Sequence, residues 1–379
     1  MINGFSSINI AITGRCNYRC RHCFMAFDKN PIQEEMTLTQ LISLLDQARA
    51  LGVNRVNLTG GEPLLRSDFV QILDAIYERD MRLEYITTNG SLITEKLLSD
   101  MHVRRQQPLI KLSFDGLGRH DWMRGVTGAE ESAIRAIRLL RQMGFPVLVQ
   151  MCLHGGNTDV LNETVKKMDE LGVDSMRIMP TAESPRWIES AGTNSLSIRQ
   201  YYEAGLKLLQ WYTAASLSMQ LTIWSFVSYY PDTGRFHCRP IRCPQGNTDC
   251  SAPVCRNTQR EIFIAYDGSV YPCNPVSGTF TAHNIKIGNA LSEGLSDVIN
   301  SEIFQSYSLM TVNDLAEQND ACRVCEFFSY CLGGCRGMAF ALDGSYTGRD
   351  PYSCIFFKEG YVKRVYETIK SYRKVVRQS

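Results

Sequence analysis

Three cysteines near the start of the chain have a spacing that suits metal chemistry. Cys16, Cys20 and Cys23 form a CxxxCxxC pattern, which places three thiolates on one loop around a common centre. A [4Fe–4S] cluster needs four ligands, so three thiolates leave one iron free to bind a further molecule, as in a catalytic metal site. The alternative is a zinc knuckle that uses His22 or a distant cysteine as its fourth ligand.

The remaining cysteines are distributed unevenly. Ten of the 14 cysteines fall between Cys238 and Cys354, and Cys152 stands alone. In a short secreted protein this number would predict disulfides, but the chain has 379 residues, and its first residues lack the charged and apolar regions of an export signal. We therefore expect a cytoplasmic protein whose closely spaced cysteines are metal ligands in a separate C-terminal module.

Composition argues against two classes of partner. The chain has 40 basic and 39 acidic residues, so no excess charge attracts nucleic acid non-specifically. No window approaches the roughly 20 apolar residues that span a membrane. We expect neither a nucleic acid nor a membrane as a partner.

The elements that must position the cysteine loop follow a repeating pattern. Short β-branched runs alternate with segments that have apolar residues at helical spacing, which predicts a parallel sheet. Motifs with polar residues follow successive strands, which favours an α/β fold with a partial (β/α)6 TIM-like barrel over residues 1–228. A small loop-rich module would then cover residues 229–379. The predicted strands are Ile8–Ile12, Arg55–Leu58, Glu84–Thr87, Ile110–Ser113, Val147–Met151 and Ser175–Ile178, and the predicted helices are Leu38–Ala50, Phe69–Arg79, Glu95–Met101, Glu131–Met143 and Val160–Leu171.

Further elements are expected beyond the sixth strand. A helix at about Ile198–Ser216 closes the barrel region, and regular structure should break over Tyr229–Cys255, which is rich in Pro, Gly, Cys and Asp. A hairpin is predicted from Glu261–Ala265 to Ser269–Tyr271, followed by loops that carry cysteines. A basic amphipathic helix at about Lys358–Val376 ends the chain, and we expect its basic side to face solvent.

The motifs after the strands, taken together with the cysteine loop, resemble the radical S-adenosylmethionine (SAM) superfamily. In that family the three cysteines hold a cluster whose free iron binds SAM. The resemblance implies one-electron cleavage of SAM to methionine and a 5′-deoxyadenosyl radical, which abstracts a hydrogen atom from the substrate, so the protein is expected to be an enzyme. The SAM contacts implied are Gly60, Gly61, Glu62 and Pro63 of the GGEP segment, Asn89 of Thr88-Asn89-Gly90, Ser113 and Asp115 of the SxDG element, and Arg124 of the HDxxRG segment.

Two further residues are expected to face the reaction. Arg177, on the sixth predicted strand, is placed to contact SAM or the substrate, and we group it with the cofactor-binding residues. Cys152 ends the fifth strand, where its thiol could donate a hydrogen atom to a substrate radical, as in some peptide epimerases of this superfamily. The alternative for Cys152 is an inert buried cysteine.

The C-terminal cysteines resemble the seven-cysteine SPASM pattern of the same superfamily. That module holds two auxiliary [4Fe–4S] clusters, which makes three clusters in all, whereas structural zinc is the alternative for this module. The resemblance assigns Cys322, Cys325, Cys331 and Cys354 to the distal cluster, and Cys255, Cys273 and Cys335 to the nearer one. Its fourth ligand is expected upstream, where Cys250 is best spaced and Cys243 or Cys238 are substitutes.

The resemblance implies a peptide or protein substrate. We predict a peptide maturase that forms a thioether or carbon–carbon crosslink in a ribosomally made peptide. A sulfatase-maturing oxidase is less favoured, because a neutral Asn274 follows Cys273 where that subgroup has an aspartate base. A peptide epimerase, a small-molecule dehydrogenase or decarboxylase, and a non-enzymatic electron carrier are also compatible with the sequence. Expected partners are a flavodoxin or ferredoxin-type electron donor and a separate leader-peptide-binding protein.

Overall fold

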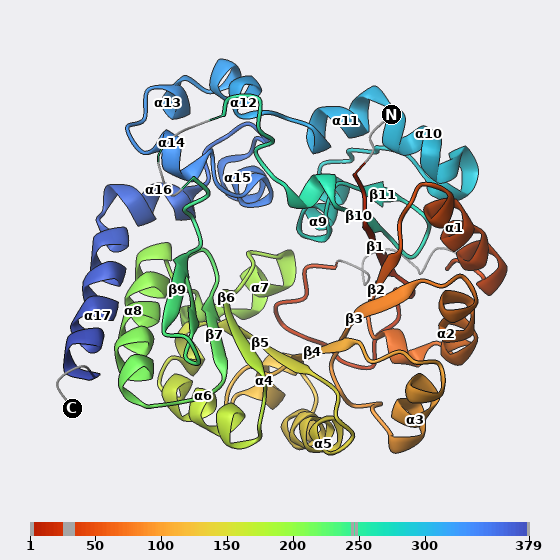
Figure 1. The fold of residues 1–379 in the computed structure, drawn as a ribbon, viewed down its shortest axis with the longest axis horizontal. Helices are drawn as coiled ribbons and strands as arrows, with labels where there is room; N and C mark the ends of the chain where they lie inside the picture. The colour runs from red at the N-terminus through yellow and green to blue at the C-terminus, as the bar shows by residue number, and fades with distance from the viewer. Residues whose placement is uncertain (1–3, 26–34, 244–245, 247–248, 377–379) are drawn as a thin grey trace.

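The computed structural model describes residues 4–25, 35–243, 246 and 249–376 (Figure 1). Its centre is an 11-stranded sheet with the order β11-β10-β1-β2-β3-β4-β5-β6-β7-β8-β9. The strands are β1 (Ser7–Ala11), β2 (Arg55–Thr59), β3 (Arg82–Thr88), β4 (Leu109–Ser113), β5 (Val147–Leu153), β6 (Ser175–Pro180), β7 (Gln220–Ile223), β8 (Val227–Tyr230), β9 (Arg235–Cys238), β10 (Glu261–Ile264) and β11 (Val270–Tyr271).

The strands β1 to β7 are parallel and follow one another in chain order. A doubly wound sheet would reverse its order at a switch point, so the continuous order confirms the partial barrel. Figure 1 shows the helices as an outer layer around the strands. This layer comprises α1 (Leu38–Ala50), α2 (Phe69–Glu78), α3 (Glu95–Val103), α5 (Ala129–Gln142), α6 (Leu161–Glu170) and α8 (Ile198–Ala214). The short helices α4 (His120–Arg124) and α7 (Pro185–Ser190) follow β4 and β6 in the chain.

Strand alternation separates an apolar outer face of the sheet from a polar inner face. Ile8 and Ile10 of β1 belong to the core between sheet and helices, where they are fully buried. Asn9, between them in sequence, bonds instead to Tyr85 of β3 across the inside of the barrel, with an Nδ2–Oη distance of 2.9 Å. Successive side chains of a strand point to opposite faces, so the barrel interior receives the polar residues.

The predicted break in regular structure at Tyr229–Cys255 is wrong for its first part. The strands β8 and β9 form an antiparallel hairpin there. Gly234, with φ of 59°, lies in the turn Pro231-Asp232-Thr233-Gly234 between them. The predicted boundary between residues 228 and 229 falls inside β8, so a division there would separate paired residues of one hairpin.

The predicted hairpin of the second region is confirmed as β10 and β11. An unpredicted feature is that β10 also pairs in parallel with β1, with Ile262 opposite Ile8. Short helices occupy the part for which cysteine-bearing loops were predicted. They are α9 (Asn274–Ala282), α10 (Leu295–Asn300), α11 (Glu302–Ser308), α12 (Val312–Gln318), α13 (Asp320–Arg323), α14 (Phe328–Cys331), α15 (Arg336–Asp343) and α16 (Pro351–Lys358).

The last helix, α17 (Tyr361–Val376), lies along α8 (Figure 1). It begins after Gly360, which has a φ of 75° and separates it from α16, so the helix predicted at about Lys358–Val376 starts three residues later than expected. Arg364 forms an ion pair with Glu203 of α8, at an Nη2–Oε2 distance of 2.8 Å. None of the described helices is long and apolar enough to cross a membrane.

Candidate active site

The cysteine loop follows β1 at the carboxyl end of the parallel strands. Cys16, Cys20 and Cys23 are all free and partly exposed. Burial raises the pKa of Cys16 to about 11, and the charges of Cys20 and Cys23 contribute to this rise, so the three thiols converge. Protons would be displaced from such thiols by a positively charged metal centre. The donor set therefore fits an iron–sulfur cluster held by this loop.

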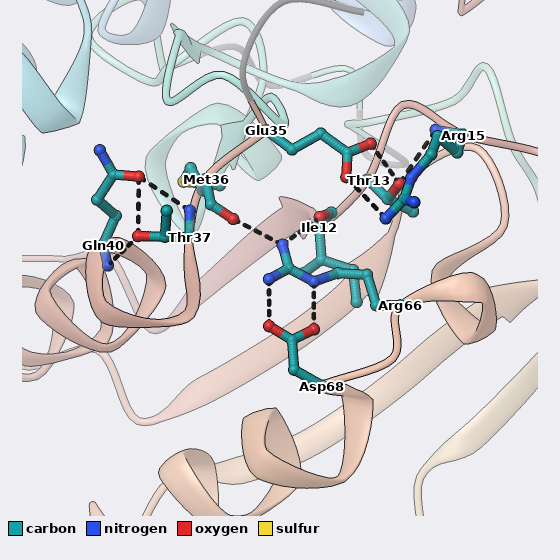
Figure 2. A network of polar contacts seen from close by, with 9 residues as sticks. All are labelled: Ile12, Thr13, Arg15, Glu35, Met36, Thr37, Gln40, Arg66 and Asp68. Carbon is teal, nitrogen blue, oxygen red and sulfur yellow. Dashed lines mark hydrogen bonds and ion pairs between the residues drawn. The ribbon is translucent and has the colours of Figure 1, made fainter.

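A buried arginine fixes the chain on both sides of the loop (Figure 2). Arg66 donates from Nη1 to the carbonyl oxygens of Ile12 and Met36, at 2.8 Å each. Its other two nitrogens form a bidentate pair with Asp68, with distances of 2.7 and 2.6 Å. Planar forks of this kind hold a fixed geometry, so Arg66 sets where the chain leaves β1 and where it enters α1.

Glu35 provides a second support for the same segment (Figure 2). Its Oε1 accepts from Thr13 Oγ1 at 2.6 Å and from the amide of Gly14 at 3.0 Å. Its Oε2 lies 3.2 Å from the guanidinium of Arg15, the residue that precedes Cys16. Sequence reasoning missed both Arg66 and Glu35. The only signal was weak: Arg66 and Asp68, two residues apart, follow the GGEP segment closely.

The two glycines of the GGEP segment allow close approach to the cysteine loop. A Cβ atom at Gly60 would lie 2.4 Å from the carbonyl oxygen of Thr13, and one at Gly61 would lie 2.1 Å from that of Arg15. The amides of Gly61 and Glu62 donate to the same two oxygens, at 2.8 Å each. Only glycine fits here, so the end of β2 and the cysteine loop form one rigid unit.

Glu62 was predicted to supply an acceptor for SAM, and its carboxylate is already engaged within the protein. It accepts from Thr88 Oγ1 at 2.7 Å, and from the amides of Asn89 and Leu64 at 2.8 and 3.2 Å. Burial raises its pKa to about 7, against the effect of these hydrogen bonds. Glu62 thus joins the ends of β2 and β3, and Pro63 begins the short helix Pro63–Leu65 that follows.

Asn89 extends this connection to the cysteine loop. Its Nδ2 donates to Asn17 Oδ1 at 2.9 Å, and its Oδ1 accepts from the amide of Ser91 at the same distance. Ser113, the last residue of β4, pairs with Gln150 of β5. Both residues therefore lie at the carboxyl end of the sheet, where the motifs predicted them.

A buried ion pair links the SxDG and HDxxRG motifs. Arg124 Nη2 lies 2.7 Å from Asp115 Oδ2, and Arg124 Nη1 lies 3.7 Å from the sulfur of Cys20. Although burial opposes ionisation, the charge of Arg124 and a hydrogen bond with His120 hold the pKa of Asp115 well below its usual range. The Nε atom of Arg124 is buried and has no acceptor among the described residues. Arg124 is thus at the cluster loop, with one donor still free for a ligand.

Cys152 lies beside this ion pair. Its amide donates to Asp115 Oδ1 at 2.9 Å, and its side chain packs against the cluster of Met123, Trp187 and Ala191. Burial raises the pKa of the Cys152 thiol, which therefore keeps its hydrogen at neutral pH. A protonated thiol suits hydrogen-atom donation and an inert core position alike.

His22 lies close to Asp115 and Cys152. Ligand atoms of His22, Asp115 and Cys152 lie within 4.8 Å of one another. Burial lowers the pKa of His22 to about 3, and the charge of Arg124 contributes. His22 is thus grouped with Cys152 and the Asp115–Arg124 ion pair.

Asn157 completes the support of the SxDG segment and was also missed by sequence reasoning. Its Nδ2 donates to the carbonyl oxygens of Asp115 and Cys152, at 2.9 Å each. The helix α7 also contacts the cysteine loop, since Ser190 Oγ lies 3.4 Å from the carbonyl oxygen of Arg21. No local motif marks Asn157, because its two partners belong to segments at the ends of two different strands.

The distal cysteine set lies around one cavity. A pocket here has four cysteines in its lining, together with Phe327, Arg349 and Lys358. The sulfurs influence one another, because Cys322, Cys354 and Cys325 each raise the pKa of Cys331, after the larger effect of burial. These four cysteines are the set that the SPASM resemblance assigns to one cluster: Cys322, Cys325, Cys331 and Cys354.

The nearer set also converges. Burial raises the pKa of Cys273, and the charges of Cys335 and Cys255 add to that rise. Tyr346 lies beside all three, because each of them raises the pKa of its hydroxyl, in addition to burial.

The candidates for the fourth ligand of this set differ in position. Cys238 lies on β9, where burial raises its pKa to about 12 and Tyr366 of α17 is its side-chain hydrogen-bond partner. Cys250 is exposed, and its carbonyl oxygen accepts from the amide of Asn313. The amide of Cys243 donates to the carbonyl oxygen of Tyr330. Cys250 and Cys243 thus lie against α12 and α14 of the cysteine-rich region, whereas Cys238 packs against α17.

Arg177 occupies a different level of the barrel from the cysteine loop. It pairs with Gln150 of β5, two residues before the pair formed by Met179 and Cys152. Burial lowers its pKa, and the other groups that affect it are Arg239 and Tyr85. Arg177 therefore lies deeper in the barrel than the Asp115–Arg124 ion pair.

Comparison with protein-family models agrees with this geometry. Residues 10–168 match the model of the radical SAM superfamily, and residues 255–326 match that of the SPASM iron-sulfur cluster-binding domain. The chain carries a radical SAM domain followed by a SPASM domain. The first match contains the cysteine loop and all four SAM motifs, and the second contains four of the auxiliary cysteines, including Cys322 and Cys325.

Relatives of this radical SAM protein include enzymes of two kinds. An AdoMet-dependent heme synthase of Methanosarcina barkeri is 25% identical over 365 residues, covering 94% of this chain and 98% of the relative. A PqqA peptide cyclase of Gluconobacter oxydans is 27% identical over 364 residues, covering 91% of this chain and 89% of the relative. The radical SAM protein is therefore a SAM-dependent enzyme, and its two domains imply that it binds iron–sulfur clusters.

Solved structures show the same fold. Native anSMEcpe with bound AdoMet has a TM-score of 0.72 at 18% identity, covering 97% of this chain and 99% of that chain. Streptococcus suis SuiB bound to S-adenosylmethionine has a TM-score of 0.69 at 18% identity, covering 93% of this chain and 77% of that chain. The radical SAM barrel and the C-terminal SPASM region therefore share their overall arrangement with those proteins.

Proposed function

We propose that this enzyme is a peptide maturase, which abstracts hydrogen from a side chain or α carbon of a ribosomally made peptide and forms a thioether or carbon–carbon crosslink. The observation that carries this proposal is the convergence of the cysteine loop, the Gly60–Gly61 contact and the Asp115–Arg124 ion pair at one end of the barrel. When bound, SAM and the reduced cluster would supply the radical that abstracts the hydrogen.

The residues of this chain would hold and enclose the reacting groups. The cysteine loop would bind the first of three [4Fe–4S] clusters, with the SPASM cysteines binding two more. Arg124 has a free Nε donor beside Cys20, which suits the carboxylate of SAM. Cys152 would present a protonated thiol to the substrate, and α7 with Trp187 would exclude water from the reacting atoms.

The comparisons support the substrate class. SuiB has been solved bound to its precursor peptide SuiA, and anSMEcpe with a Cp18Cys peptide. The PqqA peptide cyclases match over about nine-tenths of this chain. We propose the same class of substrate here, with a flavodoxin or ferredoxin-type protein as the electron donor and a separate protein that binds the leader peptide.

A second candidate is a reaction on a small molecule. It is favoured by the AdoMet-dependent heme synthase relative, which matches over 98% of its own length. The two candidates differ in whether product formation needs a peptide.

The test is an anaerobic reaction of the iron-reconstituted enzyme with SAM and dithionite, followed by mass spectrometry. We expect 5′-deoxyadenosine from the wild type and none from the variant in which Cys16, Cys20 and Cys23 are all alanine. Peptides encoded by neighbouring short reading frames are then added, and a mass loss of two hydrogens that tandem mass spectrometry assigns to a bond between two residues identifies a crosslink. Absence of 5′-deoxyadenosine from fully iron-loaded wild type would refute radical SAM activity, and conversion of a small molecule without peptide would favour the second candidate.

A further inference from the structure

The barrel interior contains a group of cations below the cysteine loop. Lys111 of β4 and Arg177 of β6 lie on inward-facing positions, and Arg239 follows β9 nearby. The three act on one another, since Arg177 lowers the pKa of Lys111, after burial, and Arg239 lowers that of Arg177. Buried like charges are unfavourable unless an anion compensates them.

The two inner cations lack an anionic partner in direct contact. Lys111 Nζ lies over the ring of Tyr85, 2.8 Å from its centroid, which is a cation–π contact. Within residues 4–25, 35–243, 246 and 249–376, neither Lys111 nor Arg177 forms an ion pair, and the guanidinium of Arg177 donates no hydrogen bond. Both side chains keep part of their surface exposed, so a ligand can reach them.

A carboxylate on the same inner face, that of Glu261, is already satisfied by neutral donors. Glu261 accepts from Asn57 Nδ2 at 2.8 Å, from the hydroxyl of Tyr85 at 3.1 Å and from Asn9 Nδ2 at 3.4 Å. The amide oxygens of Asn9 and Asn57 are buried and have no donor among the described residues. Burial and Arg177 lower the pKa of Lys111 while the charges of Glu261 and Glu84 raise it, but neither carboxylate forms an ion pair with Lys111 or Arg177 among the described residues. The inner face thus presents cations without a directly bound anion and acceptors without donors, which is the pattern of a polar binding site.

We propose that Lys111 and Arg177 bind a carboxylate of the substrate inside the barrel. The planar fork of Arg177 can hold both oxygens, and the ammonium of Lys111 adds a point charge beside it. This inference rests on the proposed function, because it assigns a subsite to the same active barrel. It narrows the substrate to one that carries an acidic group, such as a glutamate or aspartate side chain near the modified residue.

SAM also carries a carboxylate, and the structure favours the substrate as the ligand. Arg124 lies 3.7 Å from Cys20 of the cluster loop, whereas Arg177 lies two residues deeper in the sheet than the level of Cys152. The groups that affect Lys111 and Arg177 electrostatically do not include any cysteine of the loop. The cation pair is therefore grouped with Tyr85 and Glu261, on the far side of Cys152 from the cluster loop.

The experiment measures the binding of two probes to the iron-loaded enzyme with SAM present, by calorimetry or ligand-observed NMR. Both probes are amino acids whose amino and carboxyl termini are blocked and carry no charge. The probes are N-acetyl-L-glutamate methylamide and its glutamine counterpart, which has the same shape without the charge. The variants are Lys111→Met and Arg177→Met, and the control is Lys96→Met on α3, whose side chain is 83% exposed. SAM affinity and 5′-deoxyadenosine formation are measured on the same preparations.

We expect the wild type and Lys96→Met to bind the glutamate probe alike, and each inner variant to bind it at least about tenfold more weakly. The wild type should bind the glutamine probe at least about tenfold more weakly, a comparison that needs no variant to fold. Equal binding of the two probes by the wild type, or no binding of the glutamate probe, would overturn the proposal. So would variants that lose SAM affinity while their glutamate binding is unchanged.

Failure of the two proposals can be told apart. If the wild type binds the glutamate probe selectively but forms no 5′-deoxyadenosine, the carboxylate subsite stands and the proposed function fails. If it forms 5′-deoxyadenosine but does not distinguish glutamate from glutamine, the subsite fails and the radical SAM activity stands.

Discussion

Replacement of Gly61 by alanine tests the contact between β2 and the cysteine loop. The new Cβ would lie 2.1 Å from the carbonyl oxygen of Arg15 and 2.6 Å from its carbonyl carbon. Real Cβ atoms stay at least 3.0 Å from such atoms, so the two segments must separate by roughly 0.9 Å. Because both clashing atoms belong to the backbone, no side chain can rotate to relieve the contact.

The magnitude follows from what this separation breaks. The amides of Gly61 and Glu62 each donate across the contact at 2.8 Å. Loss of two such hydrogen bonds costs about 0.5–1.5 kcal/mol each, and overpacking adds about 1–3 kcal/mol. We expect Gly61→Ala to lower the free energy of unfolding by about 2–6 kcal/mol and to reduce the iron bound by the cysteine loop.

The assay is anaerobic urea unfolding together with iron content, and Gly4→Ala is the matched control. A Cβ at Gly4 has its nearest contact at 3.5 Å, an ordinary van der Waals distance, and should be tolerated. If Gly61→Ala is as stable as Gly4→Ala within about 1 kcal/mol and binds as much iron, the close approach is not rigid and the reasoning is refuted.

Three further predictions concern the ion pair, a buried histidine and the distal cluster. Asp115→Asn leaves the buried guanidinium of Arg124 without its charged partner and should lower the free energy of unfolding by about 3–5 kcal/mol in a urea titration. The control Asp159→Asn removes an exposed ion pair and should lower it by less than about 1 kcal/mol. Burial lowers the pKa of His154 from 6.5 to about 4, so the unfolded state binds the extra proton and stability should fall as pH decreases from 6.5 to 4. His154→Leu should reduce the slope of unfolding free energy against pH in this range, and an unchanged slope would contradict the assignment. Cys354→Ala should remove about four iron atoms per chain in an iron assay, while Cys238→Ala should remove none.

The sequence was sufficient to predict the barrel and the end of the barrel at which its motifs lie. Each predicted strand coincides with one of β1 to β6, because hydrophobic periodicity and glycine-terminated helices are local properties of the chain. The cysteine loop and the motifs around Glu62, Asn89 and Asp115 lie at the carboxyl ends of their strands, as parallel strands require. Sequence similarity also grouped the distal cysteines, which line one cavity.

The same reasoning could not predict which groups already have partners. Glu62 and Arg124 were expected to contact SAM, and the structure adds protein partners that the sequence does not reveal, because Glu62 is engaged by Thr88 and Asn89, and Arg124 by Asp115. These partners come from neighbouring strands whose register is set by packing of the whole sheet. Local sequence has no information on such distances.

By itself, the sequence determined the family, the order of strands and helices, and the residue types available for cluster and SAM binding. These follow from spacing within short segments, where local chain geometry limits what can form. The tertiary structure alone decided that β10 joins β1, that Glu261 enters the barrel, and that Lys111 and Arg177 both lie on its inner face without an ion-pair partner among the described residues. Residues far apart in the chain become neighbours only when the sheet closes, so their electrostatic environment is a property of the folded barrel.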